Sequence, residues 1–129
     1  MLSSKILFTG LFISASLFAS SAQELIDQNG CFSCHAIASK KAAPAFAGIG
    51  MRNKRFEGAN AKATIMNSIK NGSQGKYPRF SDSSMPGYGH LSEEDLSTLA
   101  DFILAQSSKA KGHGCMMGSK GSGMGRGMQ

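Results

Sequence analysis

The chain has 129 residues, three cysteines and a formal net charge of +6 at pH 7, which is enough for one small domain with extensions. The charge is unevenly placed, because residues 23–108 hold nine Lys or Arg and eight Asp or Glu, whereas residues 109–129 hold four basic residues and no acid. A basic tail on a nearly neutral core, in a chain that starts with an export signal, argues against a nucleic-acid partner.

The first 22 residues are typical of a secretory signal peptide. Lys5 supplies the positive start, an apolar run follows, and the small residues Ser20 and Ala22 suit a cleavage site. We expect a mature chain that begins near Gln23, reaches the periplasm and has no stable membrane insertion. The alternative is an uncleaved anchor, but the run is short for a span of ~20 residues.

A first helix is predicted over residues 24–35, where Leu25 and Ile26 begin an apolar face. Gly30 lies inside this helix, at a cost of about 1 kcal/mol relative to alanine. Close approach of another helix would explain the glycine, and fraying of the helix is the alternative.

Residues 31–35 read Cys-Phe-Ser-Cys-His, the CxxCH pattern of c-type haem attachment. Two thiols at this spacing can form thioethers with the two vinyl groups of one haem, and the adjacent histidine can bind the iron. A thioredoxin-like pair would need a preceding strand, and a zinc site would need a second ligand pair, and neither is found. We predict one covalent haem c, with Cys31 and Cys34 as thioether residues and His35 as an axial iron ligand.

A loop is predicted over residues 36–44, and it contains the pair Lys40 and Lys41. A haem-ligating histidine usually donates its second ring N–H to a carbonyl, which fixes the tautomer. The carbonyl of Pro44 is the candidate acceptor for His35. The alternative is a loop proline without a role at the haem.

The next helix is predicted over residues 46–56. Its apolar residues stand among basic ones and are Phe46, Ile49, Met51 and Phe56. We expect this helix to cover part of the haem, with Met51 facing a core.

A third helix is predicted over residues 61–71, with Asn60 as its N-cap and Gly72 at its end. Its buried stripe consists of Ile65, Met66 and Ile69. Met66 is therefore interpreted as a core residue rather than an iron ligand.

Residues 71–89 form a long loop rich in Gly, Ser and Pro, and a loop of this length in a small domain is usually functional. It contains Met85 followed by Pro86. A thioether is a soft, neutral ligand that raises the potential of haem iron, and the proline would stiffen the loop. Met85 is the predicted second axial ligand, and the rival His90 is interpreted as a surface histidine.

The last helix is predicted over residues 91–106. Ser92 and Asp95 form an acidic capping box. The buried face consists of Leu96, Leu99, Phe102 and Ile103. We expect this helix to pack across the first one near Gly30.

Residues 109–129 contain seven glycines, His113, Cys115 and several methionines. The favoured interpretation is a disordered low-complexity tail. The alternative is a copper-handling or redox-sensing segment, because these side chains suit Cu(I). Cys115 is the odd cysteine and would either pair between chains or stay free.

With CFSCH, Pro44, Met85-Pro86 and the capped last helix in this order, the chain resembles class I cytochromes c, closest to the small bacterial cytochrome c-551 (cytochrome c8) group. The matching stretches are 24–37, 44–46, 69–75 and 85–106. The resemblance implies an all-α fold of about four helices around one haem with His35 and Met85 axial. It also implies electron transfer between periplasmic or membrane redox proteins.

The chain departs from the family at two positions that bind a haem propionate. Ser68 stands where an arginine is frequent, and Lys76-Tyr77 stands where a tryptophan is usual. We expect Tyr77, Lys76 or Arg79 to take over these contacts. The loop before Met85 is also longer, and the tail has no counterpart in the family.

The predicted function is that of a monomeric periplasmic electron carrier without enzyme activity, because a His/Met-ligated iron leaves no position for a substrate. Docking is predicted at a lysine rim formed by Lys40, Lys41 and Lys54, with Lys76 as a further candidate. Two alternatives stay open: a cytochrome subunit of a periplasmic dehydrogenase complex, and a copper-handling or redox-sensing protein that acts through the tail.

Overall fold

The computed structural model describes residues 19–110, and the structural statements below concern these residues. The described α-helices are α1 Ala22–Gln28, α2 Phe46–Glu57, α3 Ala61–Asn71 and α4 Glu93–Ala105. Short 3-10 turns are η1 Cys31–Ser33, η2 Gly58–Asn60, η3 Pro78–Phe80 and η4 Gln106–Lys109. The predicted all-α fold of about four helices is confirmed, and the pairing between described segments outside helices is one isolated bridge, Ser73 with Met85.

No helix within residues 19–110 has the length and apolar character needed to cross a membrane. Most of the predicted signal peptide and nearly all of the predicted tail lie outside the described residues. The expected cleavage point after residue 22 falls in the first turn of α1, just after its N-cap Ser21.

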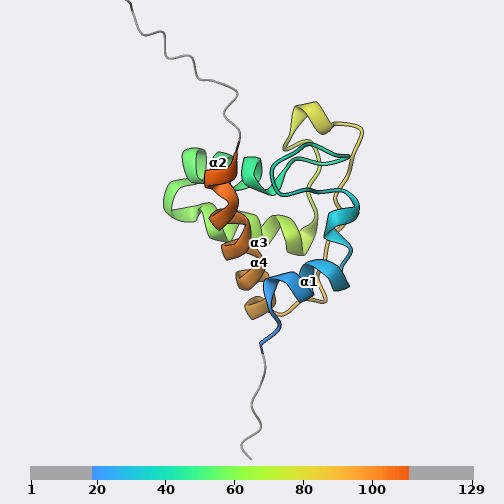
Figure 1. Ribbon diagram of the computed structural model, residues 1–129, viewed down its shortest axis with the longest axis vertical. Coiled ribbons are helices and arrows are strands. Elements are labelled where there is room, and N and C mark those ends of the chain that lie inside the picture. The colour runs from blue at the N-terminus through green and yellow to red at the C-terminus, as the bar shows by residue number, and fades with distance from the viewer. Residues whose placement is uncertain (1–18, 111–129) are drawn as a thin grey trace, which may run out of the picture.

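Helix α4 is the centre of the core, and α1, α2 and α3 all pack against it. Its buried side chains are Leu96, Leu99, Ala100 and Ile103. Figure 1 shows the start of α4 beside α1 and its end beside α2. Each buried aliphatic side chain of this kind contributes about 1.5–3 kcal/mol to folding, so α4 holds the other three helices together.

The start of α4 has the capping box that the sequence predicts. The Ser92 hydroxyl accepts from the Asp95 amide at 3.1 Å, and the Asp95 carboxylate accepts from the Ser92 amide at 3.4 Å. These bonds satisfy backbone donors that the first helical turn leaves free.

Helix α1 ends earlier than predicted, and Gly30 is not helical. Its φ of +65° lies in the left-handed region, which glycine adopts without a steric penalty. The predicted close approach of a helix at Gly30 is wrong, because an added Cβ would meet only the Ser33 hydroxyl, at 3.5 Å. The glycine instead turns the chain out of α1 into η1.

The close helix contact lies between α2 and α4. An added Cβ on Gly50 would overlap the backbone carbonyl of Ile103. The buried side of α2 runs through Phe46, Ala47, Gly50 and Asn53. The prediction that Met51 faces a core is wrong, since this side chain is 47% exposed. Gly50 and Asn53 are not hydrophobic, so the hydropathy pattern does not show which side of α2 is buried.

Helix α3 has the predicted bounds but not the predicted cap. Asn60 has helical dihedrals (φ −87°, ψ −1°) and makes no side-chain capping bond, because η2 leads directly into α3. Ile65 and Ile69 are buried, and Met66 packs half-buried against the core. The interpretation of Met66 as a core residue is therefore confirmed.

Candidate functional site

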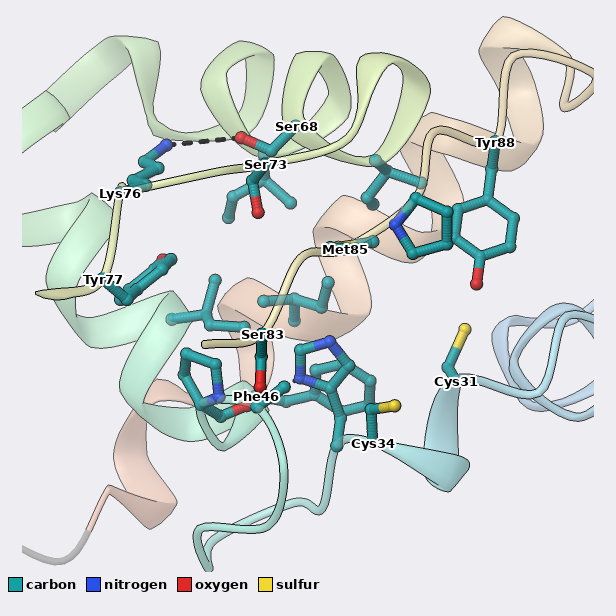
Figure 2. A pocket seen from close by; sticks show the side chains of 18 of the residues that line it. Cys31, Cys34, Phe46, Ser68, Ser73, Lys76, Tyr77, Ser83, Met85 and Tyr88 are labelled. Carbon is teal, nitrogen blue, oxygen red and sulfur yellow. Dashed lines mark hydrogen bonds between the residues drawn. The ribbon is translucent and has the colours of Figure 1, made fainter. Parts of the chain in front are cut away.

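A pocket of about 300 Å³ lies between α2, α3, η1 and the loop that carries Met85. This volume is in the usual range of small-molecule and cofactor sites. Figure 2 shows that the two ends of the pocket differ. We call Cys31, Cys34 and Tyr88 the thiol end. The opposite, polar end consists of Asn53, Ser68, Lys76 and Tyr77.

The thiol end is shaped by the short turn after Gly30. The carbonyl of Cys31 accepts from the amide of Cys34 at 3.3 Å and from the amide of His35 at 3.0 Å. Both cysteines are free thiols, Cys31 partly buried and Cys34 exposed. Burial raises the pKa of the Cys31 thiol. The turn thus presents two unpaired thiols and one imidazole to the same pocket.

His35 is held in one orientation. Its Nδ1 donates to the carbonyl of Pro44 at 2.7 Å, and its ring stacks on Phe46 with centroids 4.9 Å apart. Burial lowers the pKa of His35, although the bond to Pro44 acts in the opposite direction. Because a carbonyl can only accept, Nδ1 carries the proton, and Nε2 of the neutral ring keeps its lone pair. This is the state in which imidazole binds a metal.

The loop before α2 brings Pro44 under the histidine. The Ala43 amide donates to Cys34 O at 3.0 Å, and the Phe46 amide donates to Ala36 O at 2.9 Å. This bond also gives the first backbone amide of α2 an acceptor, which the side chain of the N-cap residue Ala45 cannot provide. The loop and α2 are therefore tied to the turn that carries the thiols.

Met85 is fixed to the end of α3 by backbone pairing. Amide and carbonyl groups of Met85 and Ser73 exchange bonds of 3.2 and 3.3 Å. Gly72 has a φ of +81°, and an added Cβ there would lie 2.6 Å from Met85 O. Only glycine fits this approach. Across the pocket, the Ser83 hydroxyl donates to Ala42 O at 2.7 Å, which ties the Met85 loop to the loop before α2.

Of the methionines in residues 19–110, Met85 is the one that lines the pocket, together with His35. In Figure 2, Met85 lies across the pocket from Phe46, on which His35 stacks. The rival His90 is exposed and does not line the pocket. Its Nε2 lies 3.1 Å from the side-chain oxygen of Asn29.

The polar end contains two of the three predicted propionate contacts. The Lys76 ammonium donates to the Ser68 hydroxyl at 3.3 Å (Figure 2). Burial lowers the pKa of Lys76; the nearby Glu57 acts against this shift, and Arg52 adds to it. Tyr77 is also half-buried here, and burial raises its pKa. The third candidate, Arg79, is exposed and lies outside the pocket lining.

Asn53 was missed in the sequence. It is fully buried, and its Nδ2 donates to Ile49 O at 2.9 Å. Its Oδ1 has no partner, and an unsatisfied buried acceptor costs about 1–3 kcal/mol. It lies seven positions after Phe46, on the same side of α2, and this helical spacing is the signal that could have found it. This oxygen makes the pocket wall polar at this end.

The predicted docking lysines differ in their contacts. Lys41 is on the thiol side, where its Nζ donates to Phe32 O at 2.6 Å. Lys40 is exposed beside it. Lys54 instead extends from α2 to the last turn, where its Nζ donates to the Ser107 hydroxyl at 2.7 Å. Lys54 and Lys41 therefore bind different segments of the chain.

The family model of cytochrome c matches residues 19–107. The chain belongs to the cytochrome c family. Cytochrome c-551 of Pseudomonas aeruginosa is 33% identical to this cytochrome over 102 residues, which cover 78% of this chain and 91% of the relative.

Solved structures agree with this assignment. Cytochrome c552 of Nitrosomonas europaea is 28% identical with a TM-score of 0.56, and the match covers 65% of this chain and 98% of that one. The class 1 cytochrome MtoD of Sideroxydans lithotrophicus ES-1 is 26% identical with a TM-score of 0.55, over 67% and 92% of the two chains. The protein is a class I cytochrome c close to the c-551 group.

This cytochrome is a monohaem electron carrier, and its cofactor is one covalently attached haem c. The pocket fits that group on its own chemistry. It has two free thiols at one end, apolar walls, and buried polar groups at the other end. When bound, the haem supplies the one-electron iron couple.

Proposed function

We propose that this cytochrome carries single electrons between redox proteins of the periplasm, with its iron held between His35 and Met85. Cys31 and Cys34 are the residues of thioether attachment. Both axial residues are neutral donors, one an imidazole and one a thioether. With both bound, the iron has no open position for a substrate, and electrons pass without bond chemistry.

The observation that carries this proposal is the independent anchoring of two donors on one pocket. His35 is oriented by the carbonyl of Pro44 at 2.7 Å. Met85 is held by its backbone bridge to Ser73. Neither side chain depends on the other for its position, so both donors are pre-organised for the same metal.

At the polar end, Lys76 and Tyr77 are the proposed contacts of the haem propionates, and Ser68 supports them by binding the Lys76 ammonium. Asn53 can add a donor only through the second N–H of Nδ2, because its Oδ1 is an acceptor. Lys76 is the one charged side chain among the described residues that line the pocket. Its bond to Ser68 holds the ammonium at the wall where an arginine is frequent in the family. Arg79 is left out of this proposal because it is exposed and does not line the pocket.

The proposed partners are redox proteins that meet a monomer at its thiol end, where Lys40 and Lys41 are exposed. Such lysines give fast, salt-sensitive encounters with acidic partners. The proposed periplasmic location rests on the N-terminal segment. In it, a positively charged residue is followed by an apolar run and then by small residues at the expected cleavage site. No described residue or relative favours the dehydrogenase-subunit or copper alternatives.

The axial assignment is tested by the visible spectrum of the oxidised protein. We expect Met85→Ala to lose the weak far-red band that marks thioether-to-iron ligation, and to lower the reduction potential. Met51→Ala and Met66→Ala are matched controls that should keep the band. If the band persists in Met85→Ala, or disappears in a control, Met85 is not the ligand.

A further inference from the structure

Helix α2 carries an exposed surface of unusual composition. Met51 and Phe56 are the large hydrophobic residues of the described chain that stay exposed, at 47% and 66%. The guanidinium groups of Arg52 and Arg55 lie over the Phe56 ring, 5.5 and 5.4 Å from its centroid. We call these four residues the α2 face.

The α2 face is connected to the pocket. The Arg52 guanidinium lies 5.2 Å from the centroid of the Tyr77 ring, and Tyr77 is part of the pocket lining. Phe56, Arg52 and Tyr77 therefore form a stack that runs from solvent to the polar end. A protein seated on Phe56 would be separated from the pocket by two side chains.

The residue types of this face are those enriched at the centres of protein interfaces, namely Phe, Met and Arg. A guanidinium that is already stacked on a ring loses less freedom when it meets a carboxylate. Two arginines beside an apolar centre are complementary to an apolar patch with an acidic rim. The face is thus built for a protein surface rather than for a small anion.

We propose that the α2 face is a docking surface for an acidic redox protein, with Phe56 at the centre of the contact. Carboxylates of the partner pair with Arg52 and Arg55. The proposal rests on the electron-carrier function. It adds a second docking site for electron transfer, at the polar end of the pocket, to the one proposed at Lys40 and Lys41.

A second copy of the chain fits this face less well. The densest acidic group of the described residues is at the start of α4, where Glu93, Glu94 and Asp95 follow one another. Asp95 is engaged in the capping box, and Glu93 is paired with Lys70 at 2.7 Å. Two of the three carboxylates therefore already have partners within their own chain.

The test uses the holoprotein and reduced flavodoxin, a small acidic flavoprotein, as the probe. Its hydroquinone gives one electron to the ferric haem and becomes the semiquinone, so the electrons balance. At low salt, Phe56→Ser and Arg55→Gln should each lower the second-order rate constant by about fivefold, as for a central interface residue. Lys70→Gln is the control: it removes one positive charge at the end of α3, outside the α2 face, and should have little effect on the rate constant.

Phe56 and Arg55 are both exposed, so the two variants are expected to fold. A visible spectrum and a reduction potential equal to those of the parent verify that they do. The proposal is overturned if both variants react at the parental rate, whether or not Lys41→Gln slows the reaction. An equal loss in Lys70→Gln, or a dimer that Phe56→Ser dissociates, also overturns it. If no form of the protein, the parent included, accepts an electron from flavodoxin or dithionite, the proposed function itself fails.

Discussion

The two ends of the pocket are built in opposite ways. The two thiols of the thiol end, and the histidine next to them, come from five consecutive residues, 31–35, whose positions follow from one left-handed glycine and one short turn. The polar end is assembled from three separate segments: Asn53 on α2, Ser68 on α3, and Lys76 with Tyr77 in the following loop.

This difference implies different kinds of binding. Two thiols next to a histidine can hold a group covalently, whatever the rest of the chain does. A hydroxyl, an ammonium and an amide hold a carboxylate only while the helices that carry them are packed. We therefore expect changes at the thiol end to decide whether haem is attached, and changes at the polar end to tune its properties.

The largest effect should follow from removing both thiols. In Cys31→Ala with Cys34→Ala no thioether can form, so haem should be extracted from the denatured protein by acidified organic solvent. The parent and the polar-end variant Lys76→Met should keep their haem under the same treatment. Haem that stays covalently bound without these thiols would contradict the proposed attachment.

A large effect is also expected from Asn53→Asp at the polar end. It puts a carboxylate at a fully buried position, beside the proposed propionates. An unpaired buried charge costs several kcal/mol, so we expect about 3 kcal/mol less stability in denaturant unfolding of the holoprotein at pH 7. The exposed Asn67→Asp on α3 is the matched control. Equal stability of the two variants would mean that position 53 is not buried in the holoprotein.

The contrast between the ends also explains what the sequence could predict. The CxxCH turn and the methionine before Pro86 are local patterns with a known chemistry, and His35 and Met85 indeed line one pocket. The Pro44 carbonyl followed from the general need of a ligating histidine for an acceptor, and the 2.7 Å bond is present.

Non-local features were harder to predict. Apart from its spacing from Phe46, Asn53 gives no indication of burial in the sequence, because its burial depends on how α2 crosses α4. Gly50 allows that crossing by letting the Ile103 carbonyl come close. The same crossing turns Met51 to solvent. Gly30 was placed in a helix because periodicity carries no information about a positive φ.

A moderate effect is expected from removing the charge of Lys76. A cation near the iron favours the reduced form, which carries one positive charge less, so Lys76→Met should lower the reduction potential. A single, partly screened charge corresponds to a shift on the order of tens of millivolts. Lys76→Arg keeps the charge and should stay near the parent, and Lys62→Met, in an exposed pair with Asp101, should change little. Equal potentials in all four proteins would remove Lys76 from the polar end.

The smallest effect should come from Tyr77→Phe, which removes only a hydroxyl. Burial raises the pKa of Tyr77, so the hydroxyl is neutral at pH 7 and acts as a dipole, not as a charge. Its loss should cost about 1 kcal/mol of stability and shift the potential less than Lys76→Met does. The ring that Arg52 covers remains, so the rate with flavodoxin should be unchanged. A rate that falls as far as in Phe56→Ser would mean that the hydroxyl itself belongs to the docking contact, and that the polar end and the α2 face act as one surface.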